Sequence, residues 1–223
     1  MQSCDLIFNQ YLPFWKKLDP SDCEFLCRNT QKFSYKKGET IHDGGTCTGV
    51  FLIKKGCLRV YILSEDGKEI TLYRLFEGDV CMLSASCVLQ AVTFEVFVDA
   101  EEDSECYLIN GNAFMAVNDR STDAKIFALE LAVDRFSNVM WVLQQVLFMS
   151  FDKRLAIFLW DEIAKSGGDT VKMTHEQIAK YMGSAREVVS RMLKYFASEG
   201  IVSSSRSEGI RITDKARLRK LAL

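Results

Sequence analysis

The stretch Thr174–Val202 reads THEQIAKYMGSAREVVSRMLKYFASEGIV and contains two short segments with helical apolar spacing, joined by Gly183. Thr174 and Gln177 have the spacing of a capping box, in which each residue satisfies a backbone N–H of the other at a helix start. Glycine at the junction can adopt a positive φ at little cost. The stretch therefore predicts a helix-turn-helix, whose second helix is the one that enters a major groove of DNA.

The second helix is predicted to start at Ser184, which repeats the capping pattern with Glu187. By the 3.6-residue period, five polar side chains share the face opposite its apolar face: Arg186, Glu187, Ser190, Arg191 and Lys194. Arg is the commonest specific partner of guanine and Glu accepts from cytosine, whereas Ser and Lys suit phosphate. We predict DNA contacts from these five residues and from Thr174 and Ser184. The alternative is the solvated face of an ordinary helix.

The sequence SAREVVSRML (184–193) resembles the recognition helix of the Crp/Fnr regulators, and the resemblance extends over nearly the whole chain. It implies that Arg186, Glu187 and Arg191 read bases of a palindromic half-site. Arg186 is similar to the cyclic AMP receptor branch of that family, whereas Ser190 is similar to the fumarate–nitrate branch.

Charge is distributed unevenly along the 223 residues, whose net charge is −2. Residues 1–149 hold 14 Lys and Arg against 21 Asp and Glu, while residues 150–223 hold 14 against 9. A basic C-terminal third suits phosphate contact by one domain only. We find neither an apolar run long enough to cross a bilayer nor a signal peptide at the N-terminus. We therefore expect a cytoplasmic protein without a membrane partner.

The N-terminal part changes from short helices at residues 5–30 to short β-rich segments at residues 33–110. Glycines at 45, 56, 67 and 78 recur every eleven residues between these segments, which predicts a β-sandwich or small barrel. The sequence from Lys37-Gly38-Glu39 to Glu77-Gly78-Asp79 resembles the cyclic-nucleotide-binding β-roll of the same family. We predict an α+β fold with a double-stranded β-helix, or jelly-roll-like β-roll, as sensor domain.

One long helix is predicted from about Ser121 to Met149. Seven apolar residues follow alternating spacings of three and four, as in a coiled-coil seam: Ile126, Leu129, Val133, Phe136, Met140, Leu143 and Leu147. We predict that they form the interface of a homodimer, as the family resemblance implies. The alternative is a helix buried within its own chain.

The predicted domains are a β-roll effector domain at 1–118, a dimerisation helix at 119–149 and a winged helix-turn-helix at 150–223. In the last domain, two β-segments after the second helix, at 201–204 and 210–213, predict a hairpin wing. Arg206 and Arg211 in this wing would contact phosphates.

Cyclic AMP is not the expected effector. In nucleotide-binding members of the family a Gly-Glu pair holds the ribose and an Arg-Ser pair the phosphate, but the matching positions here are Met82-Leu83 and Phe94-Glu95. An anionic ligand needs such donors to offset its desolvation. We predict an unknown, more apolar small molecule in a pocket formed by Met82, Leu83, Ser84 and Phe94.

The eight cysteines all lie within residues 1–149 and are expected to be reduced thiols. We expect no iron–sulfur cluster and no other cofactor, because the chain lacks the short Cys-x₂-Cys spacing of such sites. Cys4, Cys23, Cys27 and Cys106 remain one conceivable ligand set. A thiol redox switch at Cys81 and Cys87 is an alternative to a small-molecule effector.

Enzyme activity is not expected. His42 and His175, the two histidines of the chain, fall in different halves, and no P-loop, dinucleotide fingerprint or nucleophile elbow is present. The alternatives to a transcription regulator are a thiol enzyme and an effector-binding protein that does not bind DNA. The predicted function is therefore a transcription regulator that reads a palindromic operator, with RNA polymerase as a further partner if it activates.

Overall fold

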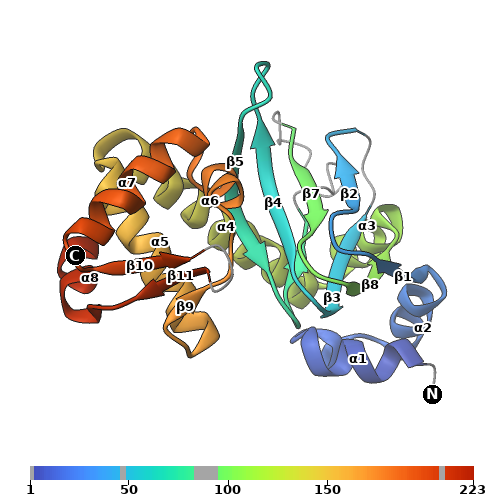
Figure 1. Cartoon of the computed structure of the whole chain (residues 1–223). Helices are drawn as coiled ribbons and strands as arrows, with labels where there is room; N and C mark the ends of the chain where they lie inside the picture. The colour runs from blue at the N-terminus through green and yellow to red at the C-terminus, as the bar shows by residue number, and fades with distance from the viewer. Residues whose placement is uncertain (1–2, 46–48, 83–94, 206–208) are drawn as a thin grey trace. The chain divides into compact units, whose positions relative to one another are not determined.

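The computed structural model describes residues 3–45, 49–82, 95–205 and 209–223 (Figure 1). These residues form two compact units. The first consists of Met1–Ile62 with Leu72–Met140, and the second of Leu63–Thr71 with Trp141–Leu223. Leu83, Ser84, Cys87, Phe94 and Arg206, which the sequence analysis assigned to sites, lie outside the described residues.

The chain begins with the helices α1 (Ser3–Tyr11) and α2 (Pro20–Arg28), separated by a short 3-10 helix at Trp15–Lys17. Asp19 is the N-cap of α2 and Pro20 occupies its first turn, where a missing N–H costs nothing. The short helices predicted within residues 5–30 are therefore confirmed.

Two four-stranded antiparallel sheets follow, with strand orders β1-β8-β3-β6 and β2-β7-β4-β5. The strands are β1 (Thr30–Tyr35), β2 (Thr40–Asp43), β3 (Val50–Lys55), β4 (Leu58–Leu63), β5 (Glu69–Leu75), β6 (Val80–Cys81), β7 (Phe97–Ala100) and β8 (Ser104–Ile109). The predicted β-roll is confirmed. Pattern reading missed the short strands β2 and β6, and it missed helix α3 (Gly111–Arg120), which Asn110 caps by accepting from the N–H of Ala113.

Strand β3 is buried on both faces, which explains its uninterrupted apolar sequence. Phe51 and Ile53 point into the core between the two sheets. Val50 and Leu52 point to the opposite face, where α1, α2 and α3 supply the covering side chains. Gly56 follows in the turn to β4 with φ +96°, and a Cβ there would lie 2.3 Å from the Ser104 hydroxyl.

Cys4 of α1 and Cys27 of α2 form a disulfide, so the expectation that all cysteines are reduced thiols was wrong for this pair. Packing of α1 against α2 brings their Cα atoms to 5.9 Å, within the range that a disulfide bridges. Because the 23-residue separation gives no sign of this contact, only the tertiary packing reveals it.

Helix α4 (Thr122–Phe148) is the long helix predicted from the heptad spacing. Ala124 and Ala128 are buried in the same core as α1 and α2, and Phe127 and Leu131 pack against it. Further along, Val139 packs on the core between the sheets. Val146, still further along the helix, is 41% exposed.

The second unit holds α5 (Phe151–Ser166), β9 (Thr170–Val171), α6 (His175–Met182), α7 (Arg186–Ser198), β10 (Val202–Ser205), β11 (Gly209–Ile212) and α8 (Lys215–Ala222). The strands form one sheet in the order β10-β11-β9, so the predicted wing gains a third strand that pattern reading missed. Leu155, Leu159, Leu193 and Phe196 are fully or almost fully buried in its core.

Replacing Phe14 with Ala is expected to lower the free energy of unfolding of the first unit by about 3–5 kcal/mol. Phe14 is 2% exposed and its ring lies 5.2 Å from the ring of Phe127 and 6.3 Å from that of Phe114. Leu6→Ala is the control, because Leu6 is 59% exposed on α1. Denaturant titration measures both, and an equal loss in the two variants would contradict this core.

Candidate nucleic-acid interface

The first helix of the helix-turn-helix, α6, begins with the predicted capping box. The Thr174 hydroxyl accepts from the Gln177 N–H at 3.1 Å, and the Gln177 carboxamide accepts from the Thr174 N–H at 2.8 Å. The helix ends at Gly183 in the left-handed region, with φ 58°. Ile178, Ala179 and Met182 turn inward to the core of the domain.

The predicted capping role of Ser184 and Glu187 was wrong. The N-cap of α7 is Ala185, without a side-chain hydrogen bond, and the helix begins at Arg186. The reason is that Ser184 still belongs to the turn, where its N–H donates to the carbonyl of Ala179 at 3.0 Å. The N-cap of α7 therefore lies one residue later in the sequence than the capping pattern indicates.

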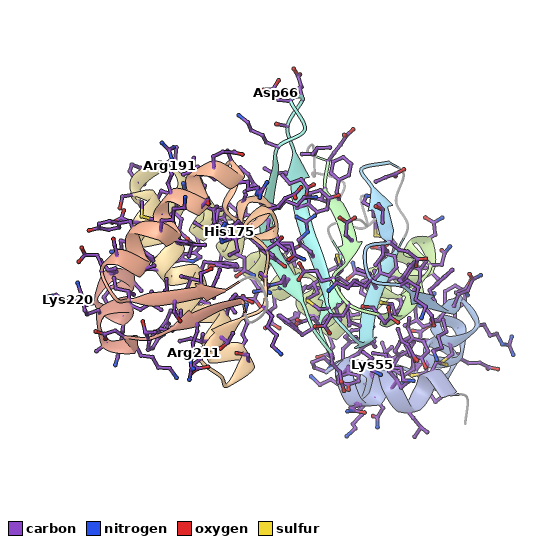
Figure 2. All side chains as sticks on the ribbon, in the orientation of Figure 1. Lys55, Asp66, His175, Arg191, Arg211 and Lys220 are labelled. Carbon is purple, nitrogen blue, oxygen red and sulfur yellow. A yellow bond between two sulfur atoms is a disulfide. The ribbon has the colours of Figure 1, made fainter. Side chains whose placement is uncertain are left out.

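Helix α7 is divided into two faces as predicted. Val189, Leu193 and Phe196 are at most 1% exposed, and Met192 packs on them from the side. Arg186, Glu187, Arg191 and Lys194 are exposed, and Ser190 is half-buried between the two faces. Figure 2 marks Arg191 on this helix.

The cations of α7 are not neutralised by their own domain. Among the residues that the structure describes, Arg186, Arg191 and Lys194 make no ion pair, whereas several other cations of the chain do. Burial of the imidazole, and then the nearby charge of Arg186, lower the pKa of His175. A guanidinium held on the surface without a carboxylate can pair with phosphate or with a guanine edge.

Arg211 of the wing has a partner within its own domain. Its Nε donates to the Asp169 carboxylate at 3.0 Å, and its side chain stays 60% exposed. Thr170, by a hydrogen bond from its hydroxyl, and Arg211 lower the pKa of Asp169. A phosphate would therefore have to compete with Asp169 for Arg211.

Arg154 of α5 is a positioning residue that sequence reasoning did not single out. Its Nη1 donates to the carbonyl of Met182, the last residue of α6, at 3.1 Å. Carbonyl groups at a helix end lack intrahelical partners, so this bond fixes the turn before α7. No pattern in the sequence identifies a helix-end carbonyl as the partner of a distant arginine.

The seven residues of the predicted seam all lie on the surface of the single chain, between 42% and 66% exposed: Ile126, Leu129, Val133, Phe136, Met140, Leu143 and Leu147. Ile126, Leu129 and Val133 line a shallow apolar hollow on α4, flanked by Glu130 and Asp134. A contiguous apolar stripe of this kind marks an interaction site on a soluble protein.

In the first unit, which contains the β-roll and is called the sensor unit below, Met82 is 2% exposed and Cys81 is fully buried. The two arginines inside the roll already have partners: Arg59 pairs with Asp99 at 3.1 Å and lies over the ring of Tyr61, and Arg74 lies 3.8 Å from Glu101. Glu95 is exposed. Neither arginine is therefore an uncompensated charge for a phosphate.

Two kinds of site find no support in the described part of the chain. No group of three or more His, Cys, Asp or Glu side chains there is placed to hold a metal ion. Cys4 and Cys27 of the conceivable ligand set are joined to each other, while Cys106 is buried in β8. No helix in the described ranges has the length and apolarity to cross a membrane.

Comparison with known proteins agrees with this geometry. The family model of the cyclic nucleotide-binding domain matches residues 32–121, and that of the Crp-like helix-turn-helix domain matches residues 153–221. The solved structure of a crp/fnr-family protein from Eubacterium rectale is 43% identical, covers 96% of this chain and 99% of its own, and superposes with a TM-score of 0.91.

Two curated relatives are more distant. The cAMP-activated global transcriptional regulator CRP of Pasteurella multocida is 23% identical over 75% of this chain and 83% of that protein. The transcriptional activator protein FnrA of Stutzerimonas stutzeri is 27% identical over 84% of this chain and 78% of that protein.

Fold, interface and relatives together define a two-part DNA-binding transcription regulator. The chain belongs to the Crp/Fnr family.

Replacing Arg191 with Ala is expected to cost about 1–3 kcal/mol of binding to the DNA sequence that the wild-type protein enriches from a random pool, and little on random DNA. Lys194→Ala, as a phosphate-contact control, should weaken both DNAs equally. Titration of labelled duplexes measures the four affinities. An equal loss on both DNAs for Arg191→Ala would exclude it as a base reader.

Proposed function

We propose that this protein is a homodimeric regulator that reads a palindromic operator and responds to an effector other than cyclic AMP. The observation that carries the proposal is the pairing of two surfaces on one chain: the unneutralised cations of α7 and the exposed apolar seam of α4. One surface suits a half-site of DNA, and the other suits a second copy that brings the second half-site.

The dimer is supported by the free energy that burial of the seam would contribute. Seven apolar side chains in heptad register would leave water on forming a two-stranded coiled coil, and each buried side chain contributes on the order of 1.5–3 kcal/mol when fully removed from water. The hollow beside Leu129 would receive a side chain of the partner helix. A two-fold axis along α4 then places the two copies of α7 about one helical turn of DNA apart.

The effector is proposed to be a small molecule that the β-roll takes up without a free buried cation. Arg59 and Arg74 are neutralised by Asp99 and Glu101, and a bound phosphate would have to break one of these pairs. We propose that the effector favours one of two arrangements of the DNA-binding domain about the segment Ser150–Asp152.

The remaining parts of the proposal follow from this role. The proposed domains are the β-roll effector domain at residues 1–118, the dimerisation helix at 119–149 and the winged helix-turn-helix at 150–223. The protein acts in the cytoplasm, where the operator is, and needs no cofactor for DNA binding. It is not an enzyme, and RNA polymerase is a partner if it activates transcription.

Replacing Leu129 with Asp is expected to convert the dimer to a monomer, because two carboxylates would meet in the seam without counter-charges. Leu6→Asp is the matched control: Leu6 is 59% exposed and Leu129 60% exposed, and both lie in helices. Sedimentation velocity gives the mass and duplex titration the operator affinity. A Leu129→Asp variant that stays dimeric would refute the proposed interface.

Cyclic AMP at about 1 mM is expected to leave the melting temperature unchanged. A ligand present at ~100 times its dissociation constant would stabilise the folded protein by about 2.7 kcal/mol, which a melting curve readily detects. A clear upward shift with cyclic AMP, absent with adenosine as control, would refute this part of the proposal.

A further inference from the structure

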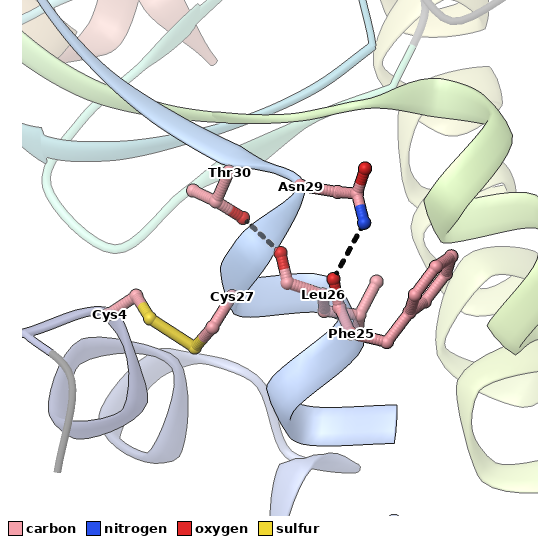
Figure 3. The surroundings of a disulfide bond; sticks show 6 residues. All are labelled: Cys4, Phe25, Leu26, Cys27, Asn29 and Thr30. Atoms are coloured by element: carbon pink, nitrogen blue, oxygen red, sulfur yellow. Dashed lines mark hydrogen bonds between the residues drawn. A yellow bond between two sulfur atoms is a disulfide. The ribbon is translucent and has the colours of Figure 1, made fainter. Parts of the chain in front are cut away.

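The disulfide between Cys4 and Cys27 joins two helix ends that differ in how firmly they are held (Figure 3). Cys27 lies near the end of α2, where the Thr30 hydroxyl donates to the carbonyl of Leu26 at 2.7 Å and the Asn29 carboxamide to that of Phe25 at 2.9 Å. These bonds close the helix end. Cys4 lies in the first turn of α1, whose N–H groups have no intrahelical acceptors.

The other described cysteines of the sensor unit lack the chemistry of a redox site, with one exception. Burial raises the pKa of the Cys57 and Cys106 thiols to about 12, and Cys81 is fully buried. Because the thiolate is the reactive form, Cys57 and Cys106 are inert. Cys23, half-buried on α2 with its thiol 3.7 Å from the carbonyl of Trp15, is the exception outside the disulfide.

The disulfide lies in the core that supports the first half of α4. Both cysteines belong to the same buried cluster as Ala124 and Ala128 of α4. Lys17, the last residue of the 3-10 helix between α1 and α2, pairs with Asp123 of α4 at 2.6 Å. These contacts connect the packing of α1 and α2 to the turns of α4 that carry the first seam residues.

We propose that Cys4 and Cys27 form a reversible redox site, whose partners are low-molecular-weight thiols and disulfides and whose state controls the support of α4. In reducing compartments, disulfides are usually transient and often redox-sensing, and the cytoplasm is the compartment proposed above. The site differs from the thiol switch considered from sequence, because Cys81 lies on strand β6 in the core between the two sheets, whereas Cys4 lies in the first turn of a helix.

The exchange balances in two steps. Because Cys4 is only 8% exposed, the first turn of α1 opens locally before a small thiolate attacks the Cys4 sulfur. The S–S bond then breaks, and Cys27 leaves as a thiolate that takes up a proton. A second small thiol attacks the mixed disulfide and releases the Cys4 thiol together with the oxidised small disulfide. Two electrons pass from the two small thiols to the protein, and the reverse reaction restores the bond.

Reduction frees the first turn of α1, which then opens locally around Cys4. Phe8, fully buried against Trp15 and Tyr107, still anchors the rest of the helix. Residues 122–131 of α4 are then packed less tightly by α1 and α2, while these helices stay folded.

The test equilibrates the full-length protein with glutathione and glutathione disulfide at a series of ratios. Thiol alkylation followed by mass spectrometry reports the Cys4–Cys27 linkage, and hydrogen exchange reports residues 122–131. We expect one two-electron transition, with faster exchange in the reduced state. Cys4→Ser and Cys27→Ser should show the faster exchange at every ratio, whereas the matched control Cys23→Ser should keep the transition.

Absence of the linkage at all ratios, or a linkage that leaves exchange at residues 122–131 unchanged, would overturn the inference. The effect on DNA rests on the proposed function: reduction should weaken operator binding by about fivefold or more. Equal operator affinity in both redox states would remove that effect while the proposed function stands. If hydrogen exchange shows the redox transition but the protein binds no palindromic DNA, the proposed function is refuted and the redox site stands.

Discussion

Helix α4 carries apolar side chains on two sides, and the residues that the structure describes cover only one of them. Ala124 and Ala128 are buried against the helices of the sensor unit, while the seam on the other side, Leu129 and Phe136 among it, is 42–66% exposed. An apolar stripe of this length is costly in water, which supports the proposed pairing of two chains. Sensing, pairing and redox control, as proposed, all act through this one helix.

The charges of the chain are arranged so that each unit can have a different partner. Inside the β-roll, Arg59 and Arg74 are matched by carboxylates, which removes the charge that an anionic ligand would seek. On α7, Arg186 and Arg191 have no such match among the described residues, although Arg211 of the wing does. Unpaired cations on α7 suit the proposed contact with DNA, because phosphate and base edges would compensate for their desolvation.

Local periodicity in the sequence was enough to predict the heptad stripe and the two faces of α7, because each depends on the repeat of a single element. The short β-rich segments predicted only a sandwich or small barrel, and the β-roll itself was predicted from the family resemblance. The capping pattern succeeded at Thr174 and failed at Ser184, where the turn after Gly183 runs one residue further before the helix begins. The Cys4–Cys27 bond and the anchoring of the α6 carbonyl end could not be predicted. Both join residues that are distant in sequence and meet only through tertiary packing.

The central claim is that one chain reads one half-site and that α4 fixes the distance between two such readers. The most direct test compares the affinity for the enriched palindrome with that for the same duplex carrying about five extra base pairs between half-sites. This insertion rotates the second half-site by half a helical turn, to the opposite side of the DNA. The account predicts that affinity falls close to that of a single half-site. Equal affinity for the two duplexes would contradict a rigid dimeric reader.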